Sequence, residues 1–267
     1  MSNPTGGFIW YELMTSDANA AARFYGAVVG WRIPDRPDPQ AGPMDYRQIG
    51  RDDAGSAGGV LQLTSQMQSN GARPAWVAYL HVPAVEPAVQ AITADGGQLL
   101  MPKTTLPVGD IAMVADPMGA PFYVMTPVPP PDKPDMASDV FSADRPQHVR
   151  WNELSSPDPA RAQAFYATHF GFRFDESMPM GPEYGDYHFI DHGGLRVGGM
   201  MKQPDSAGPG GWTFYFGVRS ATAARRAIEA AGGTVEMDLH QVPGGDWVAI
   251  AADPQGARFG IVGPRGE

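Results

Sequence analysis

Two glutamates occupy matched positions in the chain and could supply carboxylate chemistry. Glu12 lies in the apolar run Phe8–Met14, and Glu153 lies in a similar run 141 positions later. A buried carboxylate is costly unless a partner holds it or the protein uses it, so Glu12 is a candidate acid or base. In the structural alternative, a nearby Arg, Tyr or Trp N–H holds each glutamate, and Lys202 is a candidate partner of Glu153. The recurrence in both halves favours this structural role.

His81 is the second candidate for acid–base chemistry. It follows the aromatic and aliphatic stretch Trp76–Leu80. An imidazole titrates near neutral pH, so His81 could act as a base on a bound molecule. A single histidine on a strand is more often a satisfied polar core residue. We expect packing or surface roles for the histidines at positions 169, 188, 192 and 240.

The stretches that carry these residues are written twice along the chain. Glu12, Tyr25 and Gly30 each recur 141 positions later, and Gly96 recurs 136 positions later. The Asp-Pro-x-Gly sequence at 116–119 recurs at 253–256. Repeats of this length indicate two copies of a domain.

Each copy is predicted to contain two units of the order strand, helix, strand, strand, strand. In the first unit, Phe8–Met14 is a strand, Ser16 or Asp17 caps a helix that Gly30 ends, and strands follow near 31–33, 46–49 and 59–63. The second unit begins with a strand at 76–82 and a helix at 85–94. The predicted fold class is α+β, with domains at 1–127 and 147–267 joined by a proline-rich linker at 128–146.

Composition limits the partners that the protein can have. The 267 residues include 19 Lys and Arg and carry a formal net charge of −10, which argues against nucleic acid and anionic membranes. We therefore expect a small organic ligand, neutral or cationic. The absence of cysteine excludes disulfides and thiolate chemistry. No apolar run has the length of a signal or a membrane span, so we expect a cytoplasmic protein. The expected assembly is a monomer or a homodimer.

The four repeated units resemble the vicinal oxygen chelate superfamily. The resemblance rests on an Asp followed seven residues later by Phe-Tyr, as at Asp17 and Phe24-Tyr25, on the Gly-Trp or Gly-Phe after that helix, and on the Asp-Pro-x-Gly turn. The superfamily contains glyoxalase I, bleomycin and fosfomycin resistance proteins and extradiol dioxygenases. The resemblance covers almost the whole chain and implies tandem glyoxalase-like domains, each with a sheet curled into a cup.

The resemblance also implies where metal ligands would stand, on the first, fourth, fifth and eighth strands of each cup. These positions hold Trp10, Gln62, Val77 and Tyr123 in the first half and Trp151, Lys202, Thr213 and Gly260 in the second. Only Gln62 is a plausible ligand, whereas a divalent site needs several His and carboxylate groups. We therefore expect no metal and no other cofactor. The iron triad of two-domain extradiol dioxygenases is absent from the second half.

Strand side chains alternate, so residues two positions from these sites face the same cup. In the first cup this selects Glu12 and His81 as catalytic candidates, and as ligand-binding candidates it selects Trp10, Gln62, Tyr79 and Tyr123. The aromatic members would form a wall suited to a planar ligand. In the second cup, Glu153, Lys202 and Arg258 could form a closed structural network.

Three functions follow from this inventory. The first is a metal-independent binding protein, similar to the bleomycin resistance branch, that takes a small molecule into the first cup. The second is a metal-independent lyase, isomerase or hydroxylase-type enzyme that uses Glu12 or His81 as acid or base. The third is a glyoxalase-like or dioxygenase-like metalloenzyme with relocated ligands among Glu12, Gln62 and His81.

Overall fold

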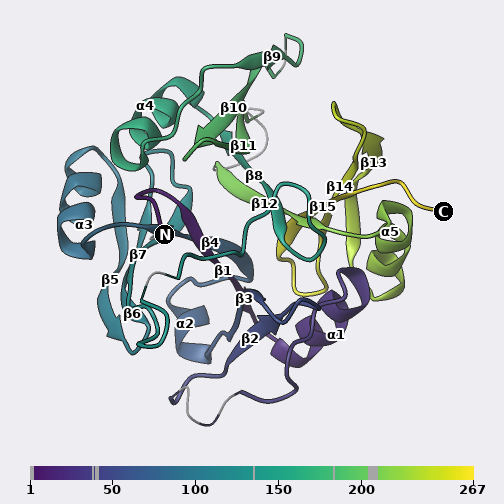
Figure 1. Ribbon diagram of the computed structural model, residues 1–267, viewed down its shortest axis with the longest axis horizontal. Coiled ribbons are helices and arrows are strands. Elements are labelled where there is room, and N and C mark those ends of the chain that lie inside the picture. The colour runs from purple at the N-terminus through teal and green to yellow at the C-terminus, as the bar shows by residue number, and fades with distance from the viewer. Residues whose placement is uncertain (1–2, 38, 40–41, 135, 183, 204–209) are drawn as a thin grey trace. The chain divides into compact units, whose positions relative to one another are not determined.

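The chain is described by a computed structural model that covers residues 3–37, 39, 42–134, 136–182, 184–203 and 210–267 (Figure 1). Within these ranges no helix is long and apolar enough to cross a membrane. The elements of the first half are β1 (Phe8–Thr15), α1 (Ala18–Val28), β2 (Tyr46–Gly50), β3 (Ser56–Gln62), α2 (Ser65–Ser69), β4 (Ala75–His81), α3 (Val85–Ala94), β5 (Gln98–Leu106), β6 (Gly109–Ala115) and β7 (Pro121–Pro127). The elements of the second half are β8 (Val149–Ser156), α4 (Pro159–Phe170), β9 (Ser177–Pro179), β10 (Asp186–His192), β11 (Leu195–Lys202), β12 (Gly211–Gly217), α5 (Ala221–Ala230), β13 (Thr234–Gln241), β14 (Trp247–Ala252) and β15 (Arg258–Gly263).

Each half of the sequence contributes one mixed sheet. The strand order is β2-β3-β1-β4-β7-β6-β5 in the first sheet and β13-β14-β15-β12-β8-β11-β10-β9 in the second. β1 runs parallel to β3 and β8 runs parallel to β11, whereas β6 and β7 are antiparallel. The prediction of an α+β fold is confirmed.

The first helix of each half begins where the capping residues predict. Asp17 accepts a hydrogen bond from the Ala20 backbone N–H at 2.9 Å, and Asp158 accepts one from Arg161 at 3.0 Å. These bonds satisfy amide groups that a helix start leaves without partners. In α4, Gly171 forms the predicted left-handed C-cap at φ 68°.

Two local predictions in the first half need correction. Val29 rather than Gly30 is the C-cap of α1, and Gly30 follows it at φ 84°. The strand predicted at 31–33 is reduced to a bridge between Arg32 and Gly50. The physical reason is that Pro34, two residues after Arg32, has no backbone N–H to donate, so the bridge does not extend into a ladder. The Trp31 indole of this segment is buried and donates to the Gln147 carbonyl at 2.8 Å.

The described residues form two compact units, and each unit takes one βαβββ module from each half. One unit contains residues 3–9 and the described parts of 77–138 and 151–212, with β4 to β7, α3, β8 to β11 and α4. The other contains the described parts of 10–76 together with 139–150 and 213–267, with β1 to β3, α1, β12 to β15 and α5. The domain boundaries at 127 and 147 stay a prediction drawn from the sequence repeat.

Each unit contains a buried hydrogen-bond relay of the same chemistry. In one unit, the Trp76 indole N–H donates to the Tyr25 hydroxyl at 2.8 Å, and Tyr25 donates to Asp253 Oδ2 at 3.1 Å. In the other unit, Trp212 donates to Tyr166 at 3.1 Å, and the Tyr166 hydroxyl donates to an aspartate, again at 3.1 Å. Buried polar groups need such partners, so the relays satisfy the tyrosines in both cores.

The aspartate at the end of each relay also shapes its own turn. Asp116, the partner of Tyr166, accepts backbone N–H bonds from Met118 at 2.8 Å and Ala120 at 2.9 Å through Oδ1. Asp253 accepts the matching bonds in its turn. Burial raises the pKa of both carboxyl groups, while these backbone donors and the tyrosine oppose the rise. The Asp-Pro-x-Gly motif is thus explained as a structural device.

Candidate functional site

Glu153 on β8 is held by a tyrosine. The Tyr187 hydroxyl donates to Glu153 Oε2 at 3.0 Å and accepts a bond from the Trp151 indole N–H at 2.7 Å. Burial, followed by the Glu153 charge, raises the pKa of Tyr187 well above its usual value of 10.0, so the hydroxyl keeps its proton. A tyrosine was one of the structural partners predicted for this glutamate.

Glu12 on β1 lies in the corresponding setting in the first half. Its side chain is only 2% exposed, and its register partner on β3 is Gly59. The indole N–H of Trp10 donates to the Tyr46 hydroxyl at 2.7 Å, which reproduces the Trp151–Tyr187 bond 141 positions earlier. The first half therefore repeats the bond between a Trp on the strand of its glutamate and a Tyr, although Glu12 is buried and Glu153 only half-buried.

A glycine next to each glutamate makes room for the tyrosine. A Cβ atom at Gly59 would lie 2.0 Å from the Tyr46 hydroxyl oxygen, and one at Gly199 would lie 2.4 Å from that of Tyr187. Gly199 is the register partner of Glu153. Each tyrosine ring thus crosses a strand at a position where only glycine leaves space.

Gln62 has a structural task. Its side-chain oxygen accepts from the Ala18 backbone N–H at 2.7 Å, and its side-chain nitrogen donates to the Ser16 carbonyl at 2.7 Å. The amide therefore joins the end of β3 to the first turn of α1, where amide groups lack intrahelical partners. A metal ion at Gln62 would compete with the bond that Ala18 donates.

Tyr79 and Tyr123 form a stacked aromatic pair. Their ring centroids are 4.3 Å apart, their planes differ by 17°, and they are register partners in the parallel pair β4–β7. Both side chains are buried. Because side chains alternate along a strand, His81 lies on the same face of β4 as Tyr79.

His81 has one ring nitrogen engaged with the backbone. Its Nδ1 lies 3.1 Å from the carbonyl oxygen of Pro4. A carbonyl can only accept, so Nδ1 carries the proton, and in the neutral ring Nε2 keeps its lone pair. A fixed tautomer with an unprotonated Nε2 is the form that can accept a proton from a ligand.

The six candidate residues fall into two groups. Tyr79, His81 and Tyr123 come together on β4 and β7 in one unit. The side chains of Trp10, Glu12 and Gln62 belong to β1 and β3 in the other unit. The convergence of both groups on one ligand stays a prediction.

The described residues do not supply the donor set of a metal site. Across the described ranges, no group of three His, Asp or Glu side chains could hold a metal ion. At the second-half positions, Thr213 accepts a bond from Arg258 at 2.7 Å, and Arg258 also pairs with Glu236 at 2.8 Å. The metal that the fold family usually carries therefore does not fit the side chains at its usual positions.

The comparisons with known proteins identify the family. The sequence profile of the glyoxalase/bleomycin resistance protein/dioxygenase superfamily matches residues 7–123 and 145–261, and the chain belongs to this superfamily. A putative glyoxylase, CFP32, from Mycobacterium tuberculosis is 29% identical over 96% of this chain and 94% of its own length. The anthracycline biosynthesis protein DnrV from Streptomyces peucetius is 26% identical over 96% of this chain and 93% of its own length.

Solved structures share the fold at low sequence identity. The Mn(II)-bound glyoxalase from Novosphingobium aromaticivorans superposes with a TM-score of 0.60 at 14% identity, covering 100% of this chain and 84% of that one. The 2,2',3-trihydroxybiphenyl 1,2-dioxygenase from Sphingomonas wittichii superposes with a TM-score of 0.63 at 12% identity, covering 97% of this chain and 90% of that one. Together with the family match to both halves, these likenesses confirm the prediction of two tandem glyoxalase-like domains.

Several residues that shape the glutamate sites were missing from the sequence-based candidates. Tyr46 and Tyr187 are 141 positions apart, as are the two glutamates, so the repeat itself marked them. Gly59 and Gly199 carried a weaker signal, because a glycine in a strand can mark a close approach of another chain segment.

Proposed function

We propose that this glyoxalase-like protein binds a small organic molecule in the first cup without a metal ion. The observation that carries the proposal is the bonding of Gln62, the one inherited ligand position with a suitable oxygen. Its amide is used to start α1, through Ala18 and Ser16. The remaining first-half positions hold Trp10, Val77 and Tyr123, which supply apolar surface for an organic ligand.

The ligand that fits best is planar and neutral or cationic. The stacked Tyr79–Tyr123 pair offers aromatic surface, and sites for small molecules combine such surface with a few directed polar groups. The net charge of −10 disfavours anionic ligands. The relative named for anthracycline biosynthesis supports a fused-ring compound, because anthracyclines are aromatic ring systems.

The second candidate function is acid–base catalysis without a metal. It is favoured by the fixed tautomer of His81, whose Nδ1 bonds the Pro4 carbonyl at 3.1 Å. Either His81, through Nε2, or Glu12 would act as the acid or base on a bound substrate. The reaction would be a lyase, isomerase or hydroxylase-type step. The relocated metal site remains the third candidate.

A ligand screen with matched variants tests the proposal. Fused-ring aromatic compounds are titrated into the full chain, and binding is followed by calorimetry. Tyr123→Ala and His81→Ala should each weaken binding about tenfold or more, whereas Lys202→Ala should mainly change stability. Equal weakening by Lys202→Ala would move the site to the second cup, and turnover of a bound compound that His81→Ala abolishes would establish the enzyme alternative.

From the sequence, we also expect a cytoplasmic location and a monomeric or homodimeric state.

A further inference from the structure

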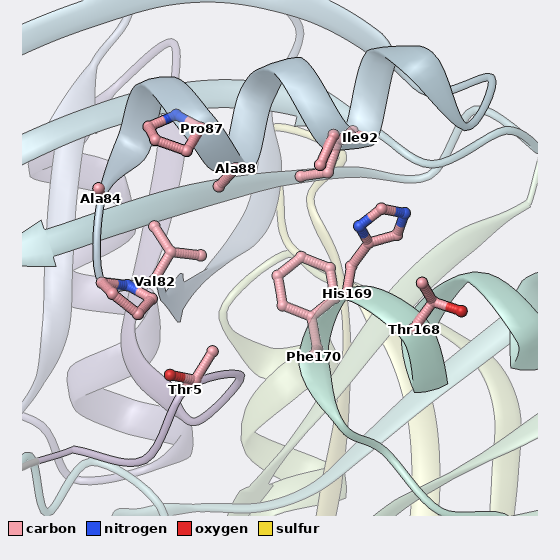
Figure 2. A pocket seen from close by; sticks show the side chains of 11 residues that line it. Thr5, Val82, Ala84, Pro87, Ala88, Ile92, Thr168, His169 and Phe170 are labelled. Atoms are coloured by element: carbon pink, nitrogen blue, oxygen red, sulfur yellow. The ribbon is translucent and has the colours of Figure 1, made fainter.

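A groove with a volume of about 330 Å³ lies between α3 and the last turn of α4, in one compact unit (Figure 2). Its walls are mostly apolar, with Val82, Ala88 and Ile92 on one side and Phe170 on the other. The polar side chains of the lining are those of Thr5, Thr168 and His169. The volume falls at the lower end of the range for small-molecule sites, about 300–1,000 Å³.

The groove is separate from the first-cup site. Phe122 on β7 packs edge-on against Phe170, with ring centroids 5.4 Å apart, so Phe122 faces the α4 side of the sheet. The neighbouring residue Tyr123 points to the opposite face, because side chains alternate along a strand. A ligand in the groove would therefore not touch the stacked tyrosine pair.

An ionised aspartate orients the imidazole at the edge of this groove. His169 Nε2 lies 2.9 Å from Asp95 Oδ2, and Arg161 donates to Asp95 Oδ1 at 2.6 Å. The bond from Arg161, followed by that from His169, lowers the pKa of the Asp95 carboxyl, so it is a carboxylate at neutral pH. A carboxylate only accepts, so Nε2 carries the proton and Nδ1 of the neutral ring is an acceptor.

A ligand in the groove can bond His169 Nδ1 only if this nitrogen faces the groove. In Figure 2, one ring nitrogen of His169 is directed toward the groove beneath Ile92, and the other lies on the far side of the ring. Because Nε2 is bonded to Asp95, the nitrogen on the groove side is Nδ1. The groove thus presents the His169 Nδ1 acceptor, together with the Thr5 and Thr168 hydroxyls, within an otherwise apolar lining.

The other unit shows that packing two such helices does not require this histidine. The sequence repeat places Val28 at the position of His169 and Ala231 at that of Asp95. In that unit, α1 and α5 pack against each other. The Phe24 ring of α1 lies close to Gly233, where a Cβ atom would be 2.8 Å from the ring. At the matched position the helix pair therefore packs through an apolar ring rather than a histidine–aspartate pair.

We propose that the α3–α4 groove binds a small apolar molecule that carries one O–H or N–H donor, such as a phenol. The donor bonds His169 Nδ1, and the ring of the ligand lies against Ala88, Ile92 and Phe170. Asp95 is a positioning residue, because it fixes the tautomer without reaching the ligand.

The test compares phenol with anisole, its methyl ether, which keeps the ring and lacks the donor. Both are titrated into the isotope-labelled full chain, and amide shifts are followed by NMR. Phenol should shift the amides of Ala88, Ile92 and Thr168 saturably and bind about tenfold more tightly than anisole. Equal affinities, shifts centred elsewhere or no saturable binding of phenol would each overturn the proposal.

Two variants alter the groove, and a third serves as the control. Ala88→Phe fills the groove and should abolish phenol binding. His169→Leu keeps an apolar side chain of similar reach and should reduce the phenol affinity to that of anisole, leaving anisole binding unchanged. Tyr123→Ala should leave phenol binding at the groove unaltered, and loss of binding in that variant would place phenol in the first cup instead.

Discussion

The hydroxyl of Tyr25 lies 3.1 Å from Oδ2 of Asp253, a residue 228 positions further along the chain. The matched Tyr166 hydroxyl makes the same bond to Asp116 at the same length. Each tyrosine belongs to the first helix of one half, and each aspartate precedes the last strand of the other half. Within each compact unit, one such bond therefore joins residues from the two copies of the repeat.

Removing one of these hydroxyls should destabilise the protein. Tyr25→Phe leaves the Trp76 indole N–H and the Asp253 carboxylate without the hydroxyl that joins them, and such a loss costs about 1–3 kcal/mol. Urea unfolding of the full chain measures the change in the free energy of unfolding. Tyr166→Phe is the matched variant in the other unit, and the two losses should add because the sites share no partner. A loss below about 0.3 kcal/mol in both variants would show that the relays contribute nothing.

Stability should fall steeply at alkaline pH. Burial raises the pKa values of Tyr25, Tyr166 and Tyr187 well above 10.0 in the folded state, whereas in the unfolded chain they titrate near 10.0. The folded state therefore binds more protons than the unfolded state above that pH, and the free energy of unfolding decreases as pH rises past 10. Thermal unfolding between pH 8 and 12 measures this slope, which Tyr166→Phe should reduce. An unchanged slope in the variant would contradict the assignment.

The glycines beside the glutamates should not tolerate a side chain. At Gly199 a Cβ atom would lie 2.1 Å from the Tyr187 ring, so Gly199→Ala must displace that ring and should cost about 1–3 kcal/mol. Gly59→Ala should behave similarly through Tyr46. The control is Gly211→Ala, because a Cβ atom there meets nothing within 4 Å and should change stability by less than about 0.5 kcal/mol. Equal effects at Gly199 and Gly211 would mean that the ring does not occupy this space.

The purified protein should carry no stoichiometric transition metal. The inherited positions hold Trp, Gln, Val and Tyr in the first half, and Gln62 is bonded to the start of α1. Elemental analysis after purification without chelators measures zinc, iron, nickel and manganese. The result that would favour the relocated metal site is near-equimolar metal that disappears in Glu12→Ala or His81→Ala.

The sequence repeat predicts the fold well because its signals are local. Asp17 and Asp158 mark helix starts by their own side-chain chemistry, and alternation along β4 places Tyr79 and His81 on one face. The same alternation, with a parallel partner strand, accounts for the Tyr79–Tyr123 pair. These features need no knowledge of how distant segments pack.

Other features could not be predicted, because they depend on which distant segments meet. The position of Tyr25 in the sequence does not show that its hydroxyl bonds to the turn at Asp253 in the second half rather than to the matching turn in the first half. Gln62 lies at an expected ligand position, yet its side chain is long enough for the amide to reach the backbone at the start of α1. Whether it forms those bonds depends on the tertiary structure. His169 has the position of a packing residue, and its pairing with Asp95 depends on how α3 meets α4.

A crystal structure of the full chain with a fused-ring aromatic compound would show whether the first cup takes an organic ligand without a metal ion. Diffraction data collected above the absorption edges of zinc, iron, nickel and manganese would reveal any bound ion. We expect ligand density against Tyr79, His81 and Tyr123 with no anomalous peak between ligand and protein. A metal ion that bridges the ligand to Glu12 or His81, or a ligand held only beside Glu153, would contradict it.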